Sequence, residues 1–177
     1  MKAYITSINE PTTGLCEWQL KRFGFEVEII SGEDSLACKL SRIYNLADDD
    51  FLRVDADVIV NKNIFDLIKS DAWWCSGKTY DIFKNDVTVG GVQYITKQCL
   101  PILRGNVGRF INAERPESQM FRLDEFHNPR VCTIHNLVDG IHGFGIKQYE
   151  YVRETKNRRK QFFYDWELYE KLVDFYK

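Results

Sequence analysis

The sequence predicts an α/β fold of the Rossmann type, with a mostly parallel sheet flanked by helices. Two observations lead to the fold class. Short apolar stretches rich in β-branched residues alternate with stretches whose apolar residues recur at helical spacing. This order of strand, helix, strand, helix, strand builds a parallel sheet with right-handed crossovers. The length of 177 residues also suits one core, so we expect a single domain over residues 1–177.

The elements of the first half follow from local patterns. Apolar residues one turn apart indicate helices, and Pro near a helix start or Gly just past its end marks the limits. The expected series is a strand over Ala3–Ile8, a helix from Pro11 that Gly24 closes, a strand over Phe25–Ile30, a helix from Leu36 to Ala47, and a strand over Phe51–Val60.

The second half gives further strands and short helices. The expected elements are a helix after Asn63, a strand over Ala72–Cys75, a loop over Tyr80–Asp86, a strand over Val87–Thr96, a helix over Thr96–Leu103, a helix from Pro116, a strand over Val131–Leu137, a loop over Asp139–Gly145, and a helical region from Gln148. Gly90 and Gly91 indicate a bend or a close backbone approach.

Composition excludes several classes of protein. A net charge of -2 argues against a globally basic nucleic-acid binder. The five cysteines are scattered without a Cys-x-x-Cys pair, which indicates free thiols in a reducing compartment. The first residues lack the apolar run of a signal peptide, and no stretch is long enough to span a bilayer. We therefore expect a cytoplasmic protein without a transmembrane segment.

Two carboxylates, Asp55 and Asp57, lie inside the apolar stretch Phe51–Val60. Alternation along this strand places both side chains on the same side of the sheet, close to each other. Two like charges so close would repel unless a cation or a tight turn relieved them. A hard divalent cation with room for phosphate oxygens fits this pair.

Other polar residues fall at the same edge of the predicted sheet. Ligands of parallel α/β sheets bind beyond the carboxyl ends of the strands. Thr6, Ser7 and Asn9 lie at the carboxyl end of the first strand and are placed to contact a base and ribose. Lys39 and Arg42 lie one turn apart on the second helix, where they could contact phosphate or remain solvated.

Four segments of the sequence are similar to motifs of one known family. "FLRVDADVIV" and the preceding "SLACKLSRIYNL" resemble the metal-binding Asp-x-Asp strand, and the helix before it, of nucleotide-sugar-dependent glycosyltransferases with the GT-A fold. "VGGVQYITKQCL", which contains Gly91, resembles the segment that lines the donor sugar. "GIHGFGIK" resembles the late His-x-x-Gly-x-x-Lys motif of glycogenin-like members, although Lys147 falls one residue early.

The resemblance implies a set of cofactors and ligands. Mn²⁺, or Mg²⁺, would be held by Asp55, Asp57 and His142, and Lys147 would contact phosphate. The donor would be a nucleoside-diphosphate sugar, with UDP as the expected nucleotide. His135 is a rival metal ligand, although a hydrogen-bonded structural role is open for it, and His127 fits a turn.

The group that acts at the acceptor is a separate question. An inverting transferase needs a carboxylate base for the acceptor hydroxyl, whereas a retaining one has no such requirement. Glu117, at the start of a short helix, is the first candidate, with Gln119 as its polar neighbour. The alternatives for the base are Asp124, Glu125 and Asp139.

The sequence therefore predicts a metal-dependent glycosyltransferase of the hexosyltransferase class. Its acceptor would be a glycan, a protein or a small molecule, and no nucleic-acid partner is expected. Two other functions stay open. The domain could bind a nucleotide-sugar without turnover, or it could be a haloacid-dehalogenase-type phosphatase in which Asp55 attacks phosphate.

Overall fold

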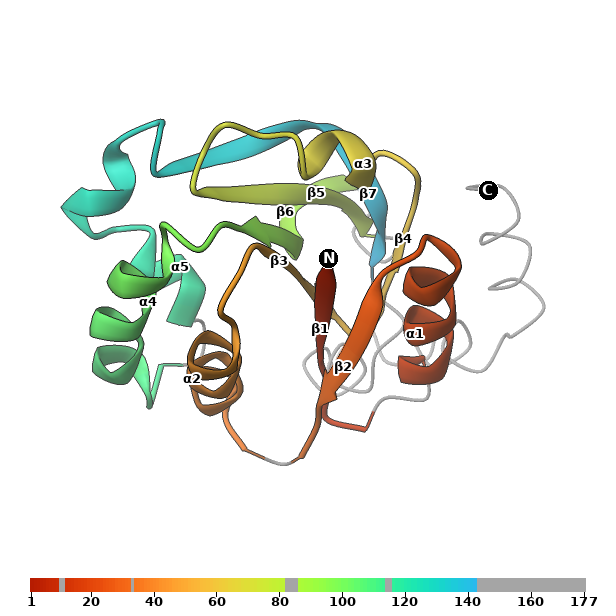
Figure 1. Cartoon of the computed structure of the whole chain (residues 1–177), viewed down its shortest axis with the longest axis horizontal. Coiled ribbons are helices and arrows are strands. Elements are labelled where there is room, and N and C mark those ends of the chain that lie inside the picture. Colours follow the sequence, from red (N-terminus) through yellow and green to blue (C-terminus); the bar gives the residue numbers. More distant parts are fainter. Residues whose placement is uncertain (10–11, 33, 82–85, 114–115, 143–177) are drawn as a thin grey trace.

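The computed structural model describes residues 1–9, 12–32, 34–81, 86–113 and 116–142. Within these residues a mixed sheet is flanked by helices (Figure 1). The strands are β1 (Lys2–Thr6), β2 (Glu26–Ile30), β3 (Phe51–Asp55), β4 (Val58–Val60), β5 (Trp74–Asp81), β6 (Asp86–Ile95) and β7 (Cys132–His142). The helices are α1 (Thr13–Arg22), α2 (Leu36–Leu46), α3 (Ile64–Leu67), α4 (Leu100–Val107), η1 (Gly108–Phe110), α5 (Pro116–Met120) and η2 (Asp124–His127).

The α/β class is confirmed, but the expectation of a mostly parallel sheet is wrong. The strand order is β2-β1-β3-β6-β5-β7-β4. The pairs β1/β2, β1/β3 and β5/β7 are parallel, whereas β3/β6, β5/β6 and β4/β7 are antiparallel. Among the described elements, helical crossovers between parallel neighbouring strands join β1, β2 and β3 alone. Between β5 and β6 the chain has a short connection, which joins antiparallel neighbours and cannot return the chain to form a parallel pair.

The stretch expected as a third strand is two strands in the structure. β3 ends at Asp55, Ala56 and Asp57 form a turn, and β4 begins at Val58. The turn is anchored, because the Ala56 amide donates to the carbonyl of Thr6 at 3.0 Å. β4 then leaves β3 and pairs with β7. Asp55 and Asp57 therefore do not lie on one face of a continuous strand.

Several other element limits differ from the expected ones. β1 ends at Thr6, short of Ile8. β5 continues through Tyr80 and Asp81, so the start of the expected loop is strand. β7 extends to His142, which makes the first part of the expected glycine-rich loop strand as well. The remainder of that loop, Lys147 and the helical region expected from Gln148 lie outside the described residues.

Helices cover both faces of the sheet, and each face has its own apolar core. One core packs α2, α4 and α5 against residues such as Phe51 and Trp74. The other packs α1 and α3 against residues such as Leu52 and Val54. Because side chains alternate along β3, its odd-numbered residues share the face of α2, α4 and α5. This is the face to which Arg53 and Asp55 belong.

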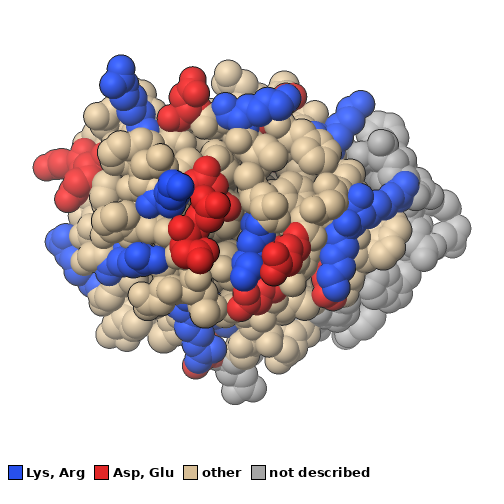
Figure 2. Space-filling view, in the orientation of Figure 1, with Lys and Arg blue, Asp and Glu red and all other residues tan. Residues whose placement is uncertain are grey.

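The surface is mixed in charge on the face that Figure 2 shows. Acidic and basic side chains lie side by side there rather than in separate fields. Lys2, for example, forms ion pairs with Glu26 at 3.9 Å and Glu28 at 3.3 Å. In the part of the chain that the structure describes, no helix has both the length and the apolar character of a membrane span.

Candidate active site

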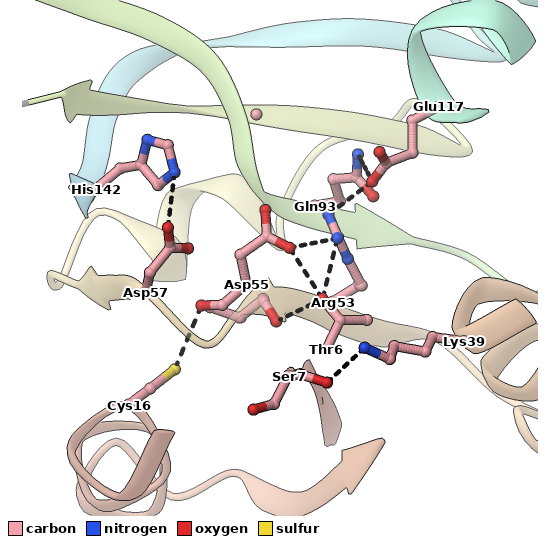
Figure 3. Close-up of polar contacts among 12 residues, drawn as sticks. Thr6, Ser7, Cys16, Lys39, Arg53, Asp55, Asp57, Gln93, Glu117 and His142 are labelled. Carbon is pink, nitrogen blue, oxygen red and sulfur yellow. Dashed lines mark hydrogen bonds and ion pairs between the residues drawn. The ribbon is translucent and has the colours of Figure 1, made fainter. Parts of the chain in front are cut away.

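The candidate site lies where β1 and β3 end and where β4 begins. Thr6 and Asp55 are register partners at the carboxyl ends of their strands. Asp57 follows in the turn, and His142 reaches it from the end of β7 because Val58 pairs with His142. Glu117 approaches from α5. In Figure 3 these side chains form a row in which Asp55 lies between the Asp57–His142 pair and Arg53.

Arg53 is the cation of this row, and its side chain is only 1% exposed. Its Nη2 contacts Oδ1 of Asp55 directly and donates to Oγ1 of Thr6 at 3.0 Å. The Thr6 hydroxyl in turn donates to the same Asp55 oxygen at 2.9 Å. Burial opposes the charge on Arg53, but Asp55 and Glu117 outweigh it and raise the pKa of the guanidinium. Arg53 is thus held charged inside the protein.

Glu117 lies on the other side of the same guanidinium. Its Oε1 is 2.7 Å from Nη1 of Arg53 and accepts a longer hydrogen bond of 3.4 Å from Nε2 of Gln93. Gln93 pairs with Arg53 in the β3–β6 ladder, which places both side chains on the face of α5. The structure therefore brings the candidate base into the site, where a buried cation holds it.

Asp57 and His142 form a second ion pair. Oδ2 of Asp57 is 3.1 Å from Nε2 of His142, and both side chains are largely buried. Burial alone would lower the pKa of His142, but Asp57, with smaller contributions from Asp55 and Asp81, outweighs it and raises the pKa to about 9. Burial likewise pushes the pKa of Asp57 upward, and the facing imidazolium brings it below its ordinary value. The pair is therefore ionic at neutral pH.

The described residues fit a divalent cation in part. No three His, Cys, Asp or Glu side chains among them are clustered closely enough to hold a metal ion. Asp57 and His142 are nevertheless spaced like neighbouring ligands, since ligand atoms of an octahedral ion with bonds of about 2.1 Å lie about 3 Å apart. Of the two Asp55 carboxylate oxygens, only Oδ1 contacts other described residues, namely Thr6 and Arg53, and the Asp55 side chain is 31% exposed. Asp55 is thus available as a third partner through its other oxygen.

Gly91 lies beside the acidic turn. Its φ is +79°, and a Cβ at this position would lie 2.8 Å from Cγ2 of Val58, the residue after Asp57. A side chain would therefore collide with the start of β4. The close approach expected from the Gly90–Gly91 pair is present at Gly91, and it packs β6 against Val58, the first residue of β4.

The residues expected to contact base and ribose are largely engaged within the protein. Thr6 is bound to Asp55 and Arg53. The Ser7 hydroxyl is 2.8 Å from that of Thr13, and the Asn9 amide donates to the Ser7 hydroxyl at 2.9 Å. Asn9 is exposed and has a positive φ of 66°. This loop is thus an ordered turn at the end of β1.

The two basic residues of α2 have different surroundings. Lys39 is 2% exposed and its Nζ donates to the Ser7 carbonyl at 2.6 Å. Arg42 is exposed and forms an ion pair of 2.6 Å with Asp34. Lys39 therefore supports the loop after β1 from inside, whereas Arg42 is a surface residue.

The remaining candidates lie apart from the row. Gln119 is exposed, two positions beyond Glu117, and so points to another side of α5. His135 is 2.7 Å from Oδ1 of the fully buried Asp139, about 20 Å along β7 from His142. Three further candidates are exposed on the surface: His127, Asp124 and Glu125. Asp139 is thus a buried partner of His135 in this structure, not an accessible base.

The sequence prediction missed Arg53, the residue that contacts both Asp55 and Glu117. Its signal was present, because a charged residue inside an apolar strand is rarely buried without an anionic partner. Alternation also placed Arg53 on the same face as Asp55. Gln93 gave a weaker signal, as a polar residue within an apolar strand.

No protein-family model matches the chain, and no curated protein matches it in sequence. Solved structures do share its fold. A glycosyltransferase involved in the glycosylation of the major capsid of PBCV-1 aligns with a TM-score of 0.55 and 12% identity, over 92% of this chain and 98% of that one. The bifunctional IspDF from Campylobacter jejuni aligns with a TM-score of 0.54 and 14% identity, over 76% of this chain and 49% of that one.

A third similar structure is 4-diphosphocytidyl-2C-methyl-D-erythritol synthase from Anaerococcus prevotii. It aligns with a TM-score of 0.52 and 9% identity, over 76% of this chain and 87% of that one. The fold is similar to the GT-A-like fold of glycosyl- and nucleotidyltransferases. At such low identity the similarity concerns the fold alone, so function has to be argued from the side chains of the site.

Proposed function

We propose that this protein is a metal-dependent glycosyltransferase of the hexosyltransferase class, with a nucleoside-diphosphate sugar as donor. UDP-sugars are the donors to test first. The observation that carries the proposal is the Asp57–His142 pair beside Asp55, at the carboxyl ends of β1 and β3. This edge is where ligands bind in α/β sheets of this kind.

The metal part of the proposal depends on three residues. Asp57 and His142 would be direct ligands, and Asp55 would contribute the oxygen that faces away from Arg53. Carboxylates and one imidazole suit Mn²⁺ or Mg²⁺. A divalent ion held there would neutralise the negative charge that develops on the departing nucleoside diphosphate.

The chain's own residues supply the rest of the site. Thr6 and Arg53 fix one oxygen of Asp55, so that this carboxylate has a defined orientation before the donor binds. Gly91 lets β6 pack closely against Val58 at the start of β4, since a Cβ there would lie 2.8 Å from Cγ2 of Val58. Glu117 remains the first candidate for receiving the proton of the acceptor hydroxyl, because it is the carboxylate that α5 brings to this row.

Ligand binding gives the first test. Thermal unfolding would be followed with Mn²⁺ alone, then with Mn²⁺ plus UDP or GDP. A ligand at one hundred times its Kd stabilises the folded state by about 2.7 kcal/mol. If neither nucleotide raises Tm in the presence of Mn²⁺, the glycosyltransferase proposal fails.

Turnover gives the second test. A panel of nucleotide-sugars with Mn²⁺ would be assayed by release of nucleoside diphosphate, in the wild type and in Asp57→Ala. We expect release with one donor and its loss in the variant. Activity that survives Asp57→Ala would contradict the metal site. Nucleotide binding without any hydrolysis or transfer would instead identify a non-catalytic binding module.

Two rival reactions are distinguished by their products. The similarity in fold to 4-diphosphocytidyl-2C-methyl-D-erythritol synthase makes nucleotidyl transfer the second candidate, and this reaction releases pyrophosphate from a nucleoside triphosphate. A phosphatase of the haloacid-dehalogenase type would release inorganic phosphate and would need Asp55 as nucleophile.

A further inference from the structure

We infer that Arg53 is a positioning residue, which holds Asp55 and Glu117 in a fixed relation through one buried guanidinium. The inference deepens the proposed function, since it assigns Arg53 to the site in which Asp55 and Glu117 would act. It concerns a residue without direct access to substrate, because the Arg53 side chain is 1% exposed. Arg53 would therefore act through the two carboxylates.

The geometry uses both terminal nitrogens of the guanidinium. Nη1 is 2.7 Å from Oε1 of Glu117, and Nη2 contacts Oδ1 of Asp55. Thr6 completes the arrangement, because its hydroxyl accepts from Nη2 at 3.0 Å and donates to the same Asp55 oxygen at 2.9 Å. One planar group thus fixes side chains from β3, β1 and α5 at once.

The backbone gives Arg53 a rigid base for this task. It lies in the middle of the sheet, opposite Tyr4 on β1 and Gln93 on β6. Gln93 also donates to the Glu117 oxygen that Arg53 holds, at 3.4 Å. α5 has only five residues, so a short helix is tied to the sheet through its Glu117 side chain. The position of Glu117 relative to Asp55 therefore depends on Arg53.

Arginine is suited to this role and lysine is not. A guanidinium offers donors on separate nitrogens in a fixed plane, whereas an ammonium concentrates its donors on one atom. A lysine at this position would keep the charge. Its single nitrogen could not replace both Nη1, which contacts Glu117, and Nη2, which contacts Asp55. The buried charge also needs its partners, since an uncompensated ion inside a protein is strongly destabilising.

Unfolding by urea tests the shared guanidinium without any ligand. The variants are Asp55→Asn, Glu117→Gln and the two combined, with Asp71→Asn as a surface control of the same charge change. We expect the combined variant to lower the urea midpoint by more than the sum of the single shifts. The physical reason is that each single variant leaves Arg53 one carboxylate, and the combined variant leaves it none.

Asp55→Asn is then made in an Arg53→Met background. There it should raise the midpoint, because it removes a carboxylate that has lost its cation. If this background does not fold, the cycle with Arg53 present still decides. Additive shifts in that cycle would overturn the inference.

Metal binding tests the positioning role. The Kd for Mn²⁺ would be measured from free Mn²⁺ by electron paramagnetic resonance, for the folded wild type, Arg53→Lys and the surface control Arg130→Lys. We expect Arg53→Lys to weaken binding by about 10-fold or more, as is common when a residue that orients a ligand is changed, and Arg130→Lys to leave it unchanged. Equal Kd values for Arg53→Lys and the wild type would overturn the positioning role.

The two tests separate the inference from the proposed function. If the wild type binds neither Mn²⁺ nor nucleotide, the proposed function fails, while the urea cycle still shows whether Asp55 and Glu117 share Arg53. If the wild type binds both and the urea shifts are additive, the function stands and the inference fails.

Discussion

Oδ2 of Asp57 lies 3.1 Å from Nε2 of His142, and the pairing of β4 with β7 produces this contact. Val58 is the register partner of His142, so Asp57, one residue earlier, meets the imidazole where the ladder ends. The contact joins the acidic turn to a residue far away in the sequence. It gives the molecule a buried ion pair at the edge where we propose that a cation and a donor bind.

This ion pair should make stability depend on pH when metal is removed. The pKa of His142 is raised from 6.5 to about 9 in the folded protein, so its contribution is complete below about pH 6.5 and is lost as the pH rises toward 9. The pKa of Asp57 is lowered, so its contribution is present above its unfolded value of 3.8 and is lost in acid. Stability from the pair is therefore greatest in mildly acidic solution.

The measurement is urea unfolding in EDTA at a series of pH values. The shift of His142 corresponds to at most about 3 kcal/mol, lost between about pH 6.5 and 9. His142→Gln removes the titrating group and should flatten this part of the profile. If wild type and variant lose stability in parallel over that range, the ion pair is not the cause.

The second prediction concerns the binding of Mn²⁺. Asp57→Asn keeps the shape of the side chain and removes its charge, so we expect the increase in Tm with Mn²⁺ to disappear. Asp71→Asn, at an exposed position, removes the same charge and should leave the increase intact. Because the ion must displace the proton of His142, the affinity for Mn²⁺ should also rise with pH up to about 9. An increase that is the same in Asp57→Asn and wild type would contradict this ligand set.

The fold could be predicted where neighbours in sequence are neighbours in space. Helical spacing identified α1 and α2, since burying one apolar face against the sheet requires that spacing. The antiparallel pairs β3/β6 and β4/β7 could not be predicted in the same way. Their partners are remote in the sequence, and period-two alternation is the same for either direction of pairing.

The site shows the same limit. Two charges in an apolar stretch marked Asp55 and Asp57 as unusual, and a tight turn was one of the two expected ways to relieve their repulsion. The sequence did not decide between the turn and a continuous strand, because the neighbours of both residues are apolar. Lys39 illustrates another limit, since helical spacing places it on the flank of α2 and cannot show that it is buried against Ser7. Arg53 could have been identified, because a buried cation needs anionic partners on its own face.

The third prediction concerns Gly91. Alanine at this position meets two difficulties, a φ of +79° and a Cβ that would lie 2.8 Å from Cγ2 of Val58. Gly24→Ala is the matched control, since Gly24 has a φ of +86° and nothing within 4 Å of its added Cβ. Backbone strain alone costs about 1–3 kcal/mol, so Gly24→Ala should lower the unfolding free energy by about that amount. Gly91→Ala should lower it by clearly more, because the collision with Val58 adds to the strain. Equal losses of unfolding free energy would show that Val58 moves aside without cost.

The last prediction concerns Gly140, on the strand that carries His142. A Cβ there would lie 2.5 Å from the carbonyl oxygen of Ile59, which is backbone and cannot rotate away. Gly140→Ala should therefore open the β4–β7 ladder and lower the unfolding free energy by about 2 kcal/mol or more.

Gly105→Ala in α4 is the control for this variant. Its added Cβ meets nothing within 4 Å, and alanine in a helix is more stable than glycine by about 1 kcal/mol. In urea unfolding we expect Gly140→Ala to lower the unfolding free energy and Gly105→Ala to raise it. Because β4 and β7 hold Asp57 against His142, Gly140→Ala should also weaken the loss of stability between about pH 6.5 and 9 that we attribute to this pair. A Gly140→Ala protein with wild-type stability and an unchanged pH profile would mean that the ladder does not hold the pair together.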